Sequence, residues 1–228
     1  HGGNNNDLMY GGADNDSLRG GSGVDSLYGG DGNDSLGGDG GNDLLDGSAG
    51  NDTVNGHAGN DTLYGDQGTD TLAGGDGNDL AYGGADSDSI RGGNNNDSLY
   101  GGQDADTIFG DAGNDLLDGS SGDDLLDGGL GADTLFGDLN DDSLVGGDAN
   151  DVLFGGDDQD TLAGGVGTDI IYGGNDEDLI NAGPGSTAGS FIGDTVYGGG
   201  VGEALGPDDD TLDLTGTEVA GGSYKVHR

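Results

Sequence analysis

The chain repeats itself every nine residues, and this period limits the possible folds more than any other property of the sequence. Residues 2–181 divide into 20 consecutive nonapeptides without an insertion. The first residue of every unit is glycine and the sixth is aspartate. The eighth is Leu, Ile, Val or Met in 19 of the 20 units, with Ala81 as the exception. A fixed period of this kind indicates a solenoid in which every repeat has the same local structure.

The residue types within a unit predict a turn followed by a strand. Glycine occupies the second position in 13 units and the fourth in 11, and Asp or Asn fills most other fourth positions. These residues tolerate positive φ, so we predict a turn over residues one to five. Residues seven to nine, such as 26–28, are predicted to form a short strand. Because strand side chains alternate, the eighth residue faces inward and its two neighbours face outward.

Composition and charge favour cations as ligands. The 228 residues carry a net charge of −42, contain no cysteine and are only 29% hydrophobic. Such values are typical of disordered chains, but the strict repeat register argues against disorder. Four Lys and Arg residues are too few for a nucleic-acid partner, and the acidic surface disfavours anionic membranes. No stretch is long and apolar enough for membrane insertion. The chain starts at His1 without a signal peptide, so we expect a piece of a larger protein.

Units such as Gly-Gly-Ser-Gly-Val-Asp-Ser-Leu-Tyr at residues 20–28 resemble the RTX (repeats-in-toxin) family, whose nonapeptide is G-G-x-G-x-D-x-U-x with U a large apolar residue. The resemblance covers residues 2–181. It implies an all-β fold, a hemolysin-type parallel β-roll: a right-handed β-solenoid with two nonapeptides per turn, about ten turns and two parallel sheets. It also implies Ca²⁺ between successive turns, held by aspartate carboxylates and backbone carbonyls, which are the oxygen ligands that this hard cation prefers.

Transferred to this chain, the resemblance implies that Asp7 shares an ion with Asp25, and so on along the array to Asp160 with Asp178. This pairing allows up to about 18 Ca²⁺ ions, whose +36 charge would nearly offset −42. Metal binding would then supply folding free energy that a thin apolar core lacks. The candidate metal ligands are Asp7, Asp16, Asp25, Asp34, Asp43, Asp52, Asp61, Asp70, Asp79, Asp88, Asp97, Asp106, Asp115, Asp124, Asp133, Asp142, Asp151, Asp160, Asp169 and Asp178.

Alternate units should lie on opposite sheets, and the sequence predicts that the two outer faces differ. The ninth residue of the odd-numbered units is aromatic in eight of ten cases: Tyr10, Tyr28, Tyr64, Tyr82, Tyr100, Phe136, Phe154 and Tyr172. The two gaps are Asp46 and Asp118, whereas the even units have only Phe109 and carry mainly Ser and Thr at position seven. Two interpretations stay open. The aromatic residues stabilise neighbouring strands, or they form a contact surface for self-association, another protein or a glycan.

The regular register ends at Asn181. We predict two regions, a roll over 1–181 and an irregular capping segment over 182–228, because terminal repeats are usually atypical. Residues 193–197 resume a repeat-like strand, and the run 208–214 is a second strand candidate. Asp194 and Asp210 are candidate extra ligands. The run 211–216 resembles segments that join RTX arrays to Hint-type autoprocessing domains.

The residues disfavour catalysis. There is no cysteine nucleophile, the only lysine is Lys225, and His1, His57 and His227 form no zinc motif. Asn33 and Asn51 match the glycosylation pattern, but only because Asn often precedes the sixth-position aspartate.

We therefore expect a non-enzymatic, calcium-binding module of a secreted bacterial protein, extracellular or at the cell surface. RTX proteins typically leave the cell by type I secretion and fold outside. The alternatives are a structural surface component assembled through the aromatic face, or an accessory module of a secreted enzyme whose catalytic domain lies elsewhere.

Overall fold

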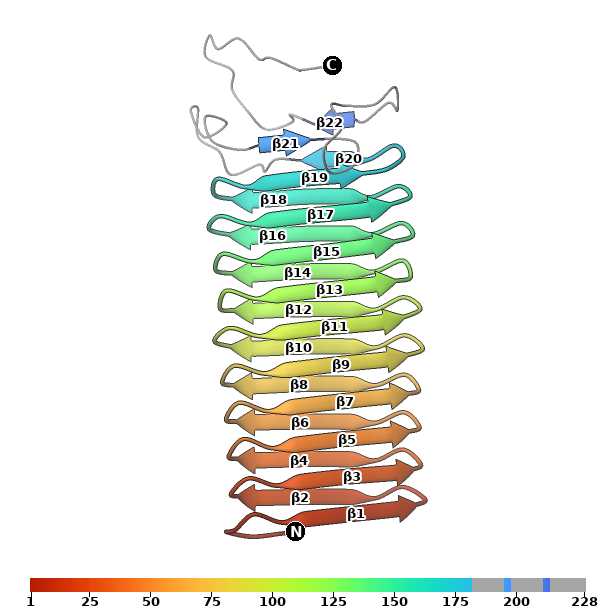
Figure 1. Ribbon diagram of the computed structural model, residues 1–228, viewed down its shortest axis with the longest axis vertical. Coiled ribbons are helices and arrows are strands. Elements are labelled where there is room, and N and C mark those ends of the chain that lie inside the picture. The colour runs from red at the N-terminus through yellow and green to blue at the C-terminus, as the bar shows by residue number, and fades with distance from the viewer. Residues whose placement is uncertain (182–194, 198–210, 214–228) are drawn as a thin grey trace.

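The protein is a flattened β-solenoid of about ten turns, as the computed structural model shows (Figure 1). The structure describes residues 1–181, 195–197 and 211–213. Each turn contributes one strand to each of two parallel sheets, so strands adjacent in sequence lie on opposite sheets. Neighbouring strands within a sheet are two nonapeptides apart through the array, for example with Tyr10 beside Tyr28. The predicted parallel β-roll with two nonapeptides per turn is confirmed.

Odd-numbered strands form one sheet, called the odd sheet here, and even-numbered strands form the even sheet. The odd sheet contains β1 (Leu8–Ala13), β3 (Ser26–Asp31), β5 (Leu44–Ala49), β7 (Thr62–Gln67), β9 (Leu80–Ala85), β11 (Ser98–Gln103), β13 (Leu116–Ser121), β15 (Thr134–Leu139), β17 (Val152–Asp157), β19 (Ile170–Gly174) and β21 (Thr195–Tyr197). The even sheet contains β2 (Ser17–Ser22), β4 (Ser35–Gly40), β6 (Thr53–Ala58), β8 (Thr71–Asp76), β10 (Ser89–Asn94), β12 (Thr107–Ala112), β14 (Leu125–Leu130), β16 (Ser143–Asp148), β18 (Thr161–Val166), β20 (Leu179–Asn181) and β22 (Thr211–Asp213).

The strands are longer than the sequence predicted. Most comprise six residues, from position seven of one unit to position three of the next, and only positions four to six form the turn. The prediction of a turn over positions one to five was therefore wrong. The predicted positive φ does occur at the second position of every unit, as at Gly84 with φ 119°, and at most fourth positions. The second-position residue nevertheless stays in the strand, because it still pairs with its counterpart on the neighbouring strand. Gly84, for example, pairs with Gly102.

The hydrophobic core is one layer thick. The eighth-position side chains from Leu18 to Ile180 project inward from both sheets and are buried, with exposed fractions between 0% and 8%. Each turn therefore contributes two apolar side chains to a continuous column along the roll axis. Ala81 occupies the column with an exposed fraction of 0%, so the exception in the sequence is a small core residue rather than a break in the array.

The two outer faces differ as the sequence predicts. On the odd sheet the ninth-position rings stack in three groups, Tyr10–Tyr28, Tyr64–Tyr82–Tyr100 and Phe136–Phe154–Tyr172, with centroids 4.8–5.2 Å apart. On the even sheet, Arg19 pairs with Asp39, and Arg91 pairs with Asp111 at 3.2 Å. The stacking confirms that aromatic residues on neighbouring strands contact one another, which stabilises the parallel pairing.

The predicted strand over 193–197 is found as β21, which pairs with β19 in the register Tyr172 to Tyr197. Within the candidate run 208–214 the strand is β22, which pairs with β20. Asp194, Asp210 and the rest of the segment predicted as a cap lie outside the described residues, so that boundary stays a prediction.

We predict that Leu117→Ala lowers the free energy of unfolding in calcium by about 2–5 kcal/mol, because it leaves a cavity in a one-layer core. The matched control is Leu139→Ala, since Leu139 is 50% exposed at the end of β15. Denaturant unfolding followed by circular dichroism measures both changes. Equal effects of the two substitutions would contradict the assigned core.

Candidate metal centre

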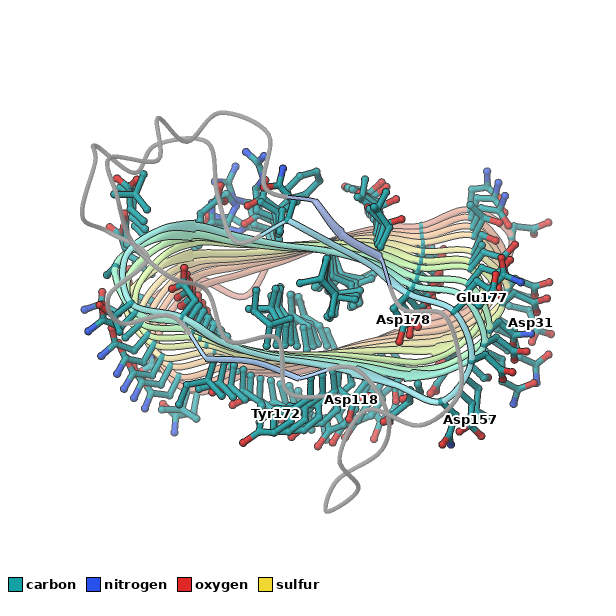
Figure 2. All side chains as sticks on the ribbon, turned by 90° about the horizontal axis from the view of Figure 1, so that it is seen from above. Asp31, Asp118, Asp157, Tyr172, Glu177 and Asp178 are labelled. Carbon is teal, nitrogen blue, oxygen red and sulfur yellow. The ribbon has the colours of Figure 1, made fainter. Side chains whose placement is uncertain are left out.

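The sixth-position aspartates form two columns inside the roll, one beside each row of turns. From Asp25 to Asp178 these side chains are buried, with exposed fractions of 0–4%, whereas Asp7 and Asp16 in the first turn are half-buried. Figure 2 shows Asp178 pointing into the interior, while Glu177 beside it points outward. The structure thus places the candidate ligands in equivalent positions on the inner side of the turns.

Hydrogen bonds link each aspartate to its counterpart one full turn away. The backbone N–H of Asp7 donates to Oδ1 of Asp25 at 2.8 Å, and the N–H of Asp70 donates to Oδ1 of Asp88 at 2.8 Å. The same bond recurs for every such pair up to Asp160 and Asp178, where the distance is 3.0 Å. The sequence-based pairing therefore joins residues that are in contact in the folded chain.

The second carboxylate oxygen of each aspartate accepts no hydrogen bond within the protein. In every sixth-position aspartate of the array, from Asp7 to Asp178, the Oδ2 atom is buried and has no hydrogen-bond donor. A buried carboxylate oxygen that lacks a donor is costly, because it has lost its hydration without replacement. A column of such atoms, repeated at every turn, indicates that a group outside the polypeptide completes the structure.

The invariant first-position glycine leaves space beside this oxygen. A Cβ on Gly83 would lie 2.7 Å from the carbonyl oxygen of Gly101 and nearer still to Oδ2 of Asp88. Gly83 is not among the residues with positive φ, so glycine is required there for room rather than for backbone conformation. Any side chain at this position would fill the space into which a carboxylate and a carbonyl oxygen both point.

The turns also offer backbone oxygens. In the described turns the carbonyls of the fourth and fifth residues accept no backbone hydrogen bond. Where the fifth residue is Asn, its side chain fixes the next turn: the N–H of Asn51 donates to Oδ1 of Asn33, and the N–H of Asn78 donates to Oδ1 of Asn60, both at 3.0 Å. In these turns the N–H groups of the fifth and sixth residues are thus satisfied by side chains, while the carbonyls of the fourth and fifth residues stay available as ligands.

Burial raises the pKa of many interior aspartates above the ordinary value of 3.8. The hydrogen bond from the backbone N–H of the preceding turn opposes this shift, and in most cases neighbouring carboxylates add to it. The pKa is raised to about 6 for Asp88 and Asp124, to about 7 for Asp61, Asp70, Asp97, Asp106, Asp115, Asp151 and Asp160, and to about 8 for Asp142. Ionised carboxylates in these columns therefore need a compensating cation.

These oxygens suit a calcium ion. Ca²⁺ takes six to eight oxygen ligands in flexible geometry, and carboxylates with backbone carbonyls are common donors. Among the described residues no three His, Cys, Asp or Glu side chains converge, so backbone oxygens would have to complete any site. The described residues also contain no helix that is long and apolar enough to cross a membrane.

Comparison with protein-family models identifies the repeats. The model for the RTX calcium-binding nonapeptide repeat matches residues 1–36, 37–72, 64–99, 73–108, 100–135, 136–171 and 154–187. The chain belongs to the RTX calcium-binding nonapeptide repeat family. RTX repeats bind calcium, so this array is a calcium-binding module, and its assignment from sequence is confirmed. A search of curated proteins found no significant match.

Sequence reasoning missed two features of the RTX array. It gave the recurrent fifth-position Asn no structural role, whereas the side chains of Asn33 and Asn60 accept hydrogen bonds from the backbone of the next turn. The signal was present, because Asn recurs there in many units. It also placed the first-position glycine in the predicted turn, although that residue lies in a strand and provides space for Oδ2.

We predict that acid partly replaces calcium in folding this RTX array. An aspartate whose pKa rises from 3.8 in the unfolded chain to about 7 in the roll binds its proton more tightly when folded. The tighter proton binding stabilises the roll fully below pH 3.8, and this stabilisation is lost as the pH rises through about 7. Circular dichroism of the calcium-free chain should therefore show more β structure at pH 5 than at pH 8. The opposite trend would contradict the burial of these carboxylates.

Proposed function

We propose that the array is a calcium-dependent folding module of a secreted protein, with ions held between successive turns by the sixth-position aspartates. The observation that carries this proposal is the column of buried Oδ2 atoms that accept no hydrogen bond. Each ion would be held by two aspartates from successive turns and by turn carbonyls. Calcium would supply positive charge and several coordination positions for carboxylate and carbonyl oxygens that have no hydrogen-bond donor in the polypeptide.

The same residues explain why folding would depend on the ion. Without calcium, the described interior columns bring like charges together one turn apart, and the two arginines of residues 1–181, Arg19 and Arg91, both lie on the outer face of the even sheet. The chain as a whole carries −42, so self-repulsion favours expanded states. An unfolded chain at low cytosolic calcium and a folded one at millimolar calcium outside the cell would suit type I secretion.

We predict that the chain is largely unstructured in chelator and forms β structure when Ca²⁺ is added, as measured by circular dichroism at pH 8. Mg²⁺ should be a poor substitute, because it demands a smaller octahedral shell and retains its water. The control is the same titration with NaCl at matched ionic strength. A compact, metal-free roll after exhaustive dialysis against chelator would contradict the proposal.

We predict that Asp88→Ala removes about two bound calcium ions, because Asp88 contacts both neighbouring counterparts. Its Oδ1 accepts from the N–H of Asp70, and its own N–H donates to Asp106. The matched control is Asp86→Asn, which removes a nearby turn charge and keeps a residue that tolerates its φ of 72°. Native mass spectrometry counts the ions. Unchanged stoichiometry in Asp88→Ala would exclude shared ligands.

A structural role at the cell surface is a second candidate function, and the stacked rings of the odd sheet favour it. Exposed apolar arrays commonly mark contact surfaces. Self-association through this face would appear as concentration-dependent assembly in calcium by analytical ultracentrifugation. A roll that stays monomeric at high concentration would exclude it.

A further inference from the structure

The rings of the odd sheet offer their faces to a ligand only where a stack ends. Within each stack the planes are nearly parallel, with interplanar angles of 2–14°, so each inner ring covers the face of its neighbour. An inner ring such as Tyr82 therefore presents only its edge to solvent. This arrangement disfavours a glycan on the inner rings, since stacking of a sugar needs an open aromatic face.

Two interruptions open those faces. In the β3–β5–β7 register Asp46 lies between Tyr28 and Tyr64, and in the β11–β13–β15 register Asp118 lies between Tyr100 and Phe136. With strands about 4.8 Å apart, the flanking rings are roughly 10 Å apart. Figure 2 shows Asp118 projecting from the same face as Tyr172. Because aspartate is shorter than tyrosine, each interruption is a slot with aromatic walls and a carboxylate floor.

The floor of each slot is held in place. The Ser48 hydroxyl donates to Oδ1 of Asp46 at 2.7 Å, and the Ser120 hydroxyl donates to Oδ1 of Asp118 at 2.8 Å. Both floor residues are half-buried on the sheet. The two slots thus have the same construction, four turns apart.

A second carboxylate lies beside each slot. Asp66 is in register with Ser48, and Asp138 is in register with Ser120. Partial burial and the charge of Asp46 raise the pKa of Asp66, and partial burial and the charge of Asp118 do the same for Asp138. Each slot therefore combines two aromatic faces with two carboxylates that repel each other, a combination that favours a cation.

On the even sheet, an arginine of this chain itself contacts the same combination of an aromatic ring and a carboxylate. Arg91 lies over the ring of Phe109, 5.2 Å from its centroid, and pairs with Asp111 at 3.2 Å. Phe109 and Asp111 occupy the repeat positions that Tyr64 and Asp66, or Phe136 and Asp138, occupy on the odd sheet. The residue one turn before the ring is arginine on the even sheet, but it is Asp46 or Asp118 on the odd sheet. A cation that binds either slot of the odd sheet must therefore come from outside the described residues.

We propose that the two slots bind two arginine or lysine side chains of an extended, basic segment of a partner protein. Cation–π contact with the walls and ion pairing with the floor would act together. Four turns place the slots about 19 Å apart, and six residues of extended chain span about 20 Å. The segment would carry cations at positions i and i+6, which lie on one face of a strand. The occupant is thus a peptide with this charge spacing rather than a neutral glycan.

The experiment uses the full chain in saturating calcium and a fluorescent heptapeptide with arginine at both ends and alternating Thr and Val between them. Fluorescence polarisation measures binding. Replacing one arginine by citrulline, which keeps the shape and removes the charge, should weaken binding at least about tenfold, because the second contact is then lost. Equal binding of the citrulline peptide, or no binding of the parent peptide, would overturn the proposal.

Variants of the protein distinguish binding in the slots from non-specific attraction of the peptide to an acidic surface. The double substitution Asp46→Tyr and Asp118→Tyr fills both slots and continues the aromatic ladder, so it should keep the roll and lose binding at least about tenfold. The matched control is Asp127→Asn, which removes a ninth-position carboxylate from the even sheet and should leave binding unchanged. Circular dichroism and calcium stoichiometry verify that each variant folds.

Two results would refute the slots as the binding site. One is equal loss in the control and the slot variant, which would indicate non-specific attraction to an acidic surface. The other is slot-dependent binding of a neutral oligosaccharide with no preference for the arginine peptide, which would identify a glycan surface.

Discussion

The structure depends on a carboxylate that bonds to the next turn with one oxygen and leaves the other unsatisfied. Oδ1 of each sixth-position aspartate from Asp25 onward accepts the N–H of its counterpart one turn earlier, so the turns are connected at a fixed spacing. Oδ2 is buried without a donor in every one of these aspartates. The first contact fixes the geometry of the stack, and the second atom makes the stack unfavourable without a cation. Under the proposed function, calcium binding and folding are therefore one process.

The spacing of two nonapeptides per turn converts each repeat position into a column. The eighth residue becomes the core, the fifth becomes a ladder of Asn side chains, and the ninth becomes a row of stacked rings on the odd sheet. A substitution at one position therefore affects the residues above and below it rather than a distant site. The outer faces can vary more than the interior, because the aspartate and apolar columns recur in every turn whereas the outer residues differ from turn to turn.

The two outer faces differ in the partners of their acidic residues. On the even sheet, Arg19 pairs with Asp39 and Arg91 pairs with Asp111. The odd sheet interrupts its aromatic row with Asp46 and Asp118, which have serine rather than basic partners. The even sheet thus pairs two of its acids within the chain, while under the proposed peptide binding the odd sheet would present charge and open ring faces to a partner.

The sequence by itself determined the repeat register and the inward eighth residue, because an exact period leaves one register and strand side chains alternate. The roll, its two nonapeptides per turn and the pairing of Asp7 with Asp25 and its successors came from the resemblance to the RTX family that this register carries. The tertiary structure decided the rest. Strand length depends on pairing between turns, which extends through Gly84 despite its positive φ. The unsatisfied Oδ2 and the space beside Gly83 arise only when turns stack, since they involve atoms from different turns. The same holds for the slots at Asp46 and Asp118, because the two walls and the floor of each slot come from three different strands.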